Sequence, residues 1–313
     1  MSFTTVVKEE ILSIKQPRVS SRAFLSALTH TCGSIGLDNG KLGFEISCET
    51  KAIVIRAAKL IKELYKVELE VFAYSNLSVN KKTIYAIKLY DDRATAILEN
   101  LRIIDLSEGL EVIFGIDEGL FENDYDEKAY VTAAFLGCGF LTLPSENSKM
   151  GYHLEFGFNN GIMADDFASL LLRCGFNPKF INRKDKCLIY IKDSESIADM
   201  LAFMESMNGV LRLSEVIVER ETRNLINRQT NCEMANIDRA IKASQKQIDC
   251  IKFIKEKGMF DSLPDVLKEF AIIREANPEV SLEELGTMFE KPLSKSGVNY
   301  RMRKLMKIAK ELE

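Results

Sequence analysis

The chain has 313 residues, of which 46% are hydrophobic, and this is enough for two or three domains with buried cores. Its formal net charge of −4 excludes a uniformly basic protein, and no stretch approaches the roughly 18 consecutive apolar residues of a membrane span. The charged start, MSFTTVVKEEILSIK, also differs from the apolar run of a signal peptide, so we expect a soluble cytoplasmic protein.

The seven cysteines are scattered along the chain, and none belongs to a CxxC pair. Their odd number argues against a disulfide framework, and their spacing argues against a zinc site. We therefore expect reduced thiols, most of them buried as small apolar groups, and neither a metal nor a cofactor.

The first two thirds of the chain contain an internal repeat. The segment AFLSALTHTCGSI at residues 23–35 aligns with AYVTAAFLGCGFL at residues 129–141, and the alignment places Cys32 on Cys138. After each of these predicted helices, the apolar spacing predicts two strands, a helix, two more strands and a closing helix. The pattern predicts an α+β fold built from two copies of an α-β-β-α-β-β-α unit.

We place the first copy at residues 1–115 and the second at residues 116–218. The acidic stretch DEGLFENDYDEK at residues 117–128 is predicted to be the connector between them, because it is polar and poorly patterned. Duplication for stability alone, with each copy burying the other, is the simplest explanation of this repeat.

The composition changes at residue 219, where Asn, Gln and Arg become frequent. Residues 219–258 are predicted to form a long, solvated helical linker, and residues 259–313 a helix-turn-helix domain of three helices. The second helix begins at Ser281, with Glu284 completing a capping box, and the third begins at Ser294 after a proline. The apolar face of the first helix is predicted to consist of Leu263, Val266, Leu267, Phe270 and Ile273.

The positive charge is concentrated at the end of the chain. Residues 219–313 carry 18 Lys and Arg against 16 Asp and Glu, so residues 1–218 carry a net charge of −6. Residues 291–310 hold seven basic residues and no acidic one, whereas a merely solvated helix normally mixes both signs.

The third helix has an apolar stripe of Val298, Met302, Leu305 and Ala309. At 100° per residue, the opposite face carries the candidate DNA-binding residues. Those expected to read base edges are Ser296, Asn299, Tyr300 and Arg303. Those expected to contact phosphates are Lys295, Arg301, Lys304 and Lys307. The alternative is a basic helix that only faces solvent.

The chain resembles the WhiA family of bacterial DNA-binding regulators over nearly its whole length. The most specific segments are GYHLEF at residues 151–156, RNLINRQTNCEMANIDRAIKASQKQI at 223–248, SLEELG at 281–286 and SKSGVNYRMRKL at 294–305. Tyr300 stands where members of the family commonly carry His.

The resemblance implies an N-terminal domain similar to LAGLIDADG homing endonucleases and a helix-turn-helix similar to the promoter-binding region of sigma factors. In an active endonuclease of this type, each motif helix ends in a carboxylate that holds a divalent metal. Those two positions are Cys32 and Cys138 here, and neutral thiols do not suit a hard cation. We therefore expect interface packing there and no metal site. Small residues are expected to let the two motif helices approach each other, namely Ala27, Gly33, Ala133, Gly137 and Gly139.

The resemblance also implies a nucleoid-associated protein without catalytic activity that binds double-stranded DNA in a sequence-specific way. It implies a role in transcription of sporulation genes, or in cell division and chromosome segregation. Two alternatives stay open. One is a residual endonuclease that uses Glu45 and Glu155, the latter beside His153 on one strand face. The other is an adaptor whose acidic domain binds a protein of the transcription or division machinery.

Overall fold

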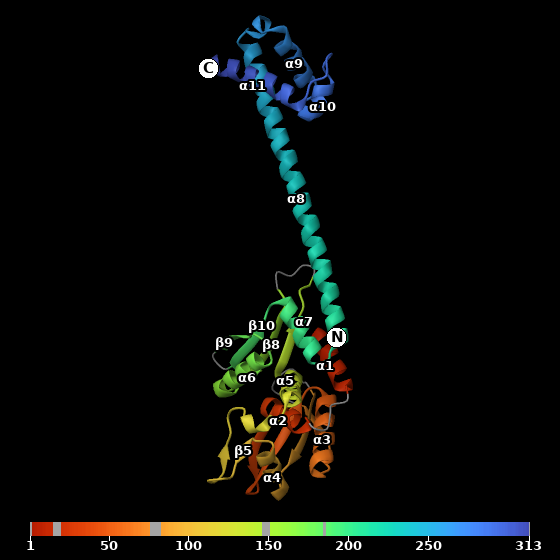
Figure 1. Ribbon diagram of the computed structural model, residues 1–313, viewed down its shortest axis with the longest axis vertical. Coiled ribbons are helices and arrows are strands. Elements are labelled where there is room, and N and C mark those ends of the chain that lie inside the picture. Colours follow the sequence, from red (N-terminus) through yellow and green to blue (C-terminus); the bar gives the residue numbers. More distant parts are fainter. Residues whose placement is uncertain (1, 15–19, 76–82, 146–150, 184–185, 313) are drawn as a thin grey trace. The chain divides into compact units, whose positions relative to one another are not determined.

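The computed structural model describes residues 2–14, 20–75, 83–145, 151–183 and 186–312 (Figure 1). The chain divides into two compact units, Met1–Glu219 and Arg220–Glu313. Within the described residues, no helix has the length and apolar character needed to cross a bilayer.

The first repeat begins with a helix and a β-hairpin and continues with a helix, two strands and a further helix. Its four antiparallel strands have the spatial order β1-β2-β4-β3. Its elements are α2 (Ser21–Cys32), β1 (Gly33–Asp38), β2 (Lys41–Cys48), α3 (Lys51–Tyr65), β3 (Phe72–Ser75), β4 (Thr83–Leu89) and α4 (Asp92–Asn100).

The second repeat has the same element order, and its sheet has the corresponding order β7-β8-β10-β9. The predicted α+β fold with a duplicated α-β-β-α-β-β-α unit is therefore confirmed. Its elements are α5 (Asp124–Cys138), β7 (Gly139–Thr142), β8 (His153–Phe158), α6 (Gly161–Arg173), β9 (Lys179–Arg183), β10 (Lys186–Ile191) and α7 (Ser194–Phe203).

The predicted connector at residues 117–128 is shorter than expected, because α5 already begins at Asp124. Asn123 caps this helix by accepting a hydrogen bond from the Tyr125 backbone amide at 3.0 Å. Three carboxylates lie in the first turn of α5, where the helix dipole favours negative charge. The acidic composition of this stretch thus marks the start of a helix. The remaining connection contains the short strands β5 (Ile104–Asp105) and β6 (Glu111–Val112) and the 3-10 turn η1 (Glu118–Leu120).

The sequence analysis missed helix α1 (Phe3–Ser13), which precedes the first repeat but is hydrogen-bonded to the second. The Thr4 hydroxyl donates to the Leu141 carbonyl at 2.8 Å and accepts from the Leu141 amide at 2.9 Å. The Glu10 carboxylate accepts hydrogen bonds from Ser206, Asn208 and Gly209, at the start of helix α8 (Met207–Glu256). Helix α1 also packs against α3 of the first repeat, so it contacts both repeats.

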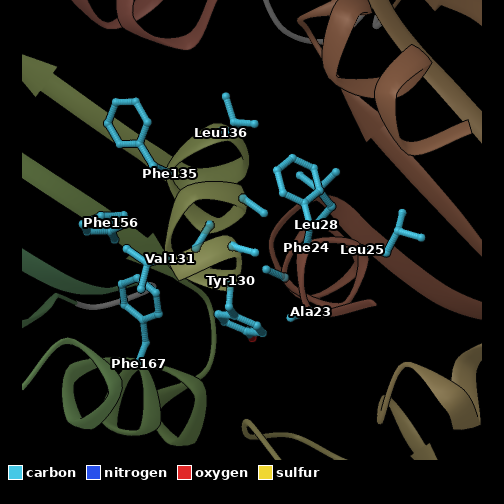
Figure 2. Close-up of a cluster of buried hydrophobic side chains, with 14 of the residues drawn as sticks. Ala23, Phe24, Leu25, Leu28, Tyr130, Val131, Phe135, Leu136, Phe156 and Phe167 are labelled. Carbon is cyan, nitrogen blue, oxygen red and sulfur yellow. The ribbon is translucent and has the colours of Figure 1, made fainter. Parts of the chain in front are cut away.

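Helices α2 and α5 form the centre of the first unit and lie side by side (Figure 2). Leu25 on α2 points away from α5, whereas Val131 on α5 points toward Phe156 and Phe167 of the second repeat. These four side chains are fully buried, so each motif helix contributes to the core of its own repeat as well as to the contact between repeats.

The second unit is all-helical, and its hydrophobic core is separate from that of the first. The expected solvated linker belongs to one continuous helix, α8 (Met207–Glu256), whose residues 221–243 are all exposed. In the helix that follows, Val266 was wrongly assigned to the apolar face, since it is 49% exposed and Ala271 is buried instead. The remaining elements are η2 (Phe260–Ser262), α9 (Asp265–Ala276), α10 (Leu282–Thr287) and α11 (Lys295–Glu311).

Candidate nucleic-acid interface

Helix α11 is fixed in the second unit by a cap and by one apolar stripe. The Ser294 hydroxyl accepts a hydrogen bond from the Gly297 amide at 3.3 Å, which stops the chain from fraying after Pro292. The stripe consists of the four residues that the sequence analysis named, and all four are buried: Val298, Met302, Leu305 and Ala309.

The turn before α11 is tight and is held by its own backbone. Helix α10 begins with a complete capping box, in which Ser281 and Glu284 exchange hydrogen bonds of 3.2 Å. After α10, the Leu293 amide donates to the Gly286 carbonyl at 2.9 Å. A Cβ on Gly286 would lie 2.3 Å from the Leu293 carbonyl oxygen, so only glycine permits this approach. The order α9, α10, short turn, α11 therefore has the connectivity of a helix-turn-helix.

The face of α11 opposite the buried stripe is exposed and cationic. Among the residues that the structure describes, Lys295 and Arg303 have no carboxylate within ion-pair distance. Tyr300 is 60% exposed, and the Lys304 ammonium lies 4.9 Å from the centre of its ring. Lys307 faces Glu311 at 3.9 Å, but both side chains are largely exposed, so this pair is weak. The exposed predicted residues are Lys295, Ser296, Asn299, Tyr300, Arg303, Lys304 and Lys307.

Arg301 differs from the other predicted residues, because its side chain is only 18% exposed. Its guanidinium lies 4.9 Å from the centre of the Phe289 ring and 3.4 Å from a Glu269 carboxylate oxygen. Phe289 in turn stacks on Phe270 at 6.1 Å. The sequence carries a signal for this position, since Arg301 is three residues after Val298 and one before Met302 and so borders the buried stripe.

In the first unit, Cys32 and Cys138 are the last residues of α2 and α5, where the two helices meet. Gly137 is required for this contact, because a Cβ there would lie 2.0 Å from the Thr31 hydroxyl and 2.9 Å from the Cys32 sulfur. The reason for Gly33 and Gly139 is different from the one expected. The nearest atoms to a Cβ at these positions belong to Thr29 and Phe135 of the same helix, so these glycines permit the sharp change from helix to strand.

The ends of α2 and α5 border a cleft of about 740 Å³, which Cys138, Glu155, Arg183 and Lys186 help to line. Burial raises the pKa of the Cys138 thiol to about 12, so it is neutral. The pKa of Cys32 is also raised, first by its hydrogen bond to Cys48 and then by burial. Within the described part of the chain, no three His, Cys, Asp or Glu side chains are placed to hold one metal ion.

The expectation that most cysteines are fully buried is wrong: Cys187 is buried and Cys232 is exposed, whereas the other five, Cys32 and Cys138 among them, are partly buried. The expected pairing of His153 with Glu155 on one strand face is confirmed: their side chains lie 2.9 Å apart, and His153 stacks on Tyr190. In the first repeat, the Glu45 carboxylate accepts a hydrogen bond from the Tyr74 hydroxyl at 3.1 Å.

Comparison with known proteins matches both units to the same family. Family models match the WhiA N-terminal LAGLIDADG-like domain at residues 18–104, the WhiA LAGLIDADG-like domain at 127–223 and the WhiA C-terminal HTH domain at 226–309. The chain is 36% identical to the probable cell division protein WhiA of Thermoanaerobacter pseudethanolicus over 317 residues, which cover 100% of this chain and 98% of the relative. It is 36% identical over 315 residues to the protein of the same name from Bacillus pumilus, covering 100% of this chain and 97% of the relative.

The fold is similar to that of a solved structure, the full-length DUF199/WhiA from Thermatoga maritima. The TM-score is 0.58 at 22% sequence identity, and the match covers 99% of each chain. Because the likeness extends over nearly the whole length of these relatives and includes all three family domains, the chain belongs to the WhiA family.

Proposed function

We propose that this protein is a sequence-specific DNA-binding protein without catalytic activity, which acts in cell division and in the control of transcription. The observation that carries the proposal is helix α11, which buries one apolar face and presents an exposed face with cations and hydrogen-bonding side chains. Its relatives are named probable cell division proteins, which supports the cellular role. Roles in sporulation and chromosome segregation belong to the same proposal.

The side chains of α11 divide into two groups by chemistry. Asn299 suits the donor and the acceptor on the adenine edge, and Arg303 suits the two acceptors on the guanine edge, because each side chain can make two parallel hydrogen bonds. Ser296 and Tyr300 lie on the same exposed face and complete the proposed base-reading set. Lysines are better suited to phosphates as point charges, and those available are Lys295, Lys304 and Lys307.

We propose a different role for Arg301 from the phosphate contact expected from the sequence. Its contacts lie inside the second unit, with Glu269 on α9 and with Phe289 just after α10, and they fix the orientation of α11 against these two helices. Arg301 is then a positioning residue that supports the DNA-reading face.

The first unit would supply a second contact surface. Arg183 and Lys186 line the cleft at the ends of α2 and α5, where they can meet phosphates locally despite the acidic character of this part of the chain. An acidic domain can equally bind a protein of the transcription or division machinery, which is the adaptor alternative.

A residual endonuclease is the second alternative, and Glu155 is its best candidate because its carboxylate lines the same cleft. Against it stands the chemistry of the motif positions, since a neutral thiol at Cys138 provides neither charge nor oxygen for magnesium. A plasmid-nicking assay with magnesium or manganese tests this alternative. Reproducible cutting that Glu155→Ala abolishes would establish it.

The proposed function is tested by measuring the affinity of the full chain for DNA by fluorescence anisotropy over a range of salt concentrations. Two kinds of duplex are compared: genomic fragments selected by their binding to the protein (the enriched duplexes) and random sequences. Asn299→Ala and Arg303→Ala are expected to cost about 1–3 kcal/mol on the enriched duplexes and much less on random ones. Lys307→Ala is expected to weaken binding to both, and to lower the salt slope by about 1.

The matched control is Lys252→Ala, which removes an exposed lysine from α8 in the same unit. It is expected to leave affinity and sequence preference unchanged. If the three α11 variants bind both kinds of duplex like the wild type, α11 does not take part in DNA binding and the proposal fails.

A further inference from the structure

A second cleft in the first unit lies between the two repeats and differs in character from the one described above. Its volume is about 500 Å³, and its walls come from α2, β1, the connection between the repeats, the end of β8 and the start of α6. Among the described residues that line it, none is Asp, Glu, Lys or Arg. We call it the apolar cleft. Its volume suits a small molecule, and its lack of cations makes it unsuitable for phosphate.

The rim of the apolar cleft carries large apolar side chains that are open to solvent. Leu37 on β1 is 72% exposed, and Phe114, just after β6, is 63% exposed. Further lining residues from the second repeat, Phe158 and Met163, are buried. Exposed apolar side chains around a concave surface are typical of binding sites, because a ligand there removes them from water.

One polar group in the wall of the apolar cleft has an unused hydrogen-bonding atom. His30 lines the cleft from α2, and its Nδ1 lies 2.7 Å from the hydroxyl oxygen of buried Tyr130. The Nε2 atom of His30 is buried and has no hydrogen-bond partner among the described residues. Buried polar atoms are nearly always hydrogen-bonded, so this nitrogen calls for a partner. The ring itself is partly exposed, so a small shift of the cleft wall brings a ligand atom to Nε2.

The neighbours of His30 decide which hydrogen bond Nε2 can make. The single hydroxyl proton of Tyr130 has two acceptors within reach, His30 Nδ1 at 2.7 Å and the Met163 sulfur at 3.8 Å. The imidazole nitrogen is the nearer and the stronger acceptor, so the proton goes to Nδ1. Burial lowers the pKa of His30 to about 4, so the ring is neutral at neutral pH and carries its own proton on Nε2. The unused atom is therefore a donor.

We propose that the apolar cleft binds an uncharged small molecule whose carbonyl oxygen accepts a hydrogen bond from His30 Nε2 and whose apolar ring system is covered by the cleft walls. A charged ligand does not fit, because a charge removed from water would find no opposite charge among the described lining residues. This site is separate from the helix-turn-helix and from the proposed phosphate contacts of Arg183 and Lys186.

The apolar cleft and the cleft that contains Arg183 and Lys186 share part of their walls. Thr31, Gly157 and Asn159 line both. A molecule bound in the apolar cleft would therefore contact residues that border the basic side chains as well. Its binding can be measured without DNA, so the test below does not depend on the proposed function.

The test observes the histidine rings of the full chain by NMR after labelling with ¹⁵N-histidine. The chain contains only two histidines, so His153, which lies 2.9 Å from Glu155, is an internal control. The probe is coumarin, an uncharged pair of fused rings with a lactone carbonyl. Coumarin is expected to shift the ring signals of His30 and not those of His153, with a Kd on the order of 1 mM for so small a molecule. Without coumarin, the nitrogen shifts are expected to place the His30 proton on Nε2.

Two related probes test the hydrogen bond and the requirement for a neutral ligand. The first, 2H-chromene, lacks the carbonyl oxygen of coumarin and is expected to bind about 3- to 10-fold more weakly. The second, coumarin-3-carboxylate, carries a charge and is expected not to bind. In His30→Phe, the preference for coumarin over 2H-chromene is expected to disappear, as measured by saturation-transfer NMR of the probes.

A variant at the rim tests the apolar contact without disturbing buried residues. Phe114→Ser is expected to weaken coumarin binding by about 3-fold or more, because it removes an exposed ring from the cleft. Leu172→Ser is the matched control: Leu172 is 57% exposed, lies on α6 in the same unit and does not line the cleft. It is expected to bind coumarin like the wild type, with circular dichroism confirming that each variant is folded.

Three outcomes would overturn the proposal. The first is a His30 signal that stays unchanged up to the solubility limit of coumarin, or that shifts no more than the signal of His153. The second is an equal preference for coumarin over 2H-chromene in the wild type and in His30→Phe. The third is an equal loss of binding in Phe114→Ser and Leu172→Ser.

Discussion

The contact between the two motif helices depends on the absence of a side chain at Gly137, and Gly137→Ala tests this directly. An added Cβ would lie 2.0 Å from the Thr31 hydroxyl oxygen, 2.7 Å from the Thr31 Cβ and 2.9 Å from the Cys32 sulfur. The Thr31 hydroxyl cannot turn away freely, because it donates a hydrogen bond to the Ala27 carbonyl at 2.7 Å. The new methyl group therefore has to move a side chain that is already engaged.

Three effects set the size of the change in unfolding free energy. Overpacking a tight contact costs about 1–3 kcal/mol. Losing the Thr31 hydrogen bond costs about 0.5–1.5 kcal/mol more. Alanine is favoured over glycine within a helix by about 1 kcal/mol, which offsets part of this loss. We expect Gly137→Ala to destabilise the first unit by about 1–3 kcal/mol.

The measurement is a urea titration followed by pulsed hydrogen exchange of peptides from α2 and α5, which separates unfolding of the first unit from that of the second. Gly161→Ala is the matched control, because its Cβ would meet no atom closer than 3.9 Å and it lies at the start of a helix in the same unit. The control is expected to be neutral or slightly stabilising. A midpoint for Gly137→Ala at or above that of the control would refute the argument that the helix contact requires glycine.

Three other contacts give measurable effects. Burial alone would raise the pKa of Glu10, but its hydrogen bonds from α8 lower it on balance below the ordinary 4.5, so its carboxylate stabilises the fold above that pH. The difference in melting temperature between wild type and Glu10→Gln should therefore be full at neutral pH and disappear as pH falls through the lowered pKa; a difference that persists in acid would contradict this. Arg301→Ala should destabilise the second unit by about 1–2 kcal/mol through loss of its Phe289 and Glu269 contacts, with Arg301→Lys intermediate, and the salt slope of DNA binding should not change. The interaction with Cys32 and the hydrogen bond that the Cys48 sulfur accepts from the Thr50 amide at 3.4 Å lower the pKa of Cys48 to about 6, so its alkylation should reach half its maximal rate near pH 6, whereas that of Cys138 should still be rising at pH 10; parallel profiles would contradict this difference.

The helix-turn-helix was the part most open to prediction from sequence, because its signals are local. Periodicity alone identifies the buried stripe of α11, and the capping box at Ser281 lies within one helical turn. Repeat alignment likewise predicts the duplicated unit, since each copy presents the same order of apolar patterns. These features need no knowledge of which distant segments meet.

Features that depend on distant contacts were missed or misjudged. Helix α1 forms hydrogen bonds with Leu141 and with the start of α8, which are far away in the sequence. The residues near α1 therefore do not indicate which segments it contacts. Arg301 is charged and borders the exposed face of α11, which suggested a side chain in solvent. Its side chain is largely covered instead, because it contacts Phe289 and Glu269 on other segments. The glycines at 33 and 139 were correctly singled out, whereas the reason for them is local backbone geometry and not the helix contact.

The cysteines at the motif positions show the same limit, because the residues around them come from distant segments. Aligning the two copies draws attention to Cys32 and Cys138, because they are equivalent and both stand at the motif positions. Strand register gives the two repeats different residues at the end of the second strand, since Cys48 lies two residues beyond Ile46, the partner of Gly33, whereas Phe158 lies two residues beyond Phe156, the partner of Gly139. A symmetric sequence pattern thus has asymmetric surroundings: burial raises the pKa of Cys138 to about 12, whereas the first repeat alone carries a cysteine at the end of its second strand, and the interaction with Cys32 lowers the pKa of that Cys48 to about 6. Alkylation at neutral pH should therefore favour Cys48 of the first repeat over Cys138 of the second, although the motif is present in both.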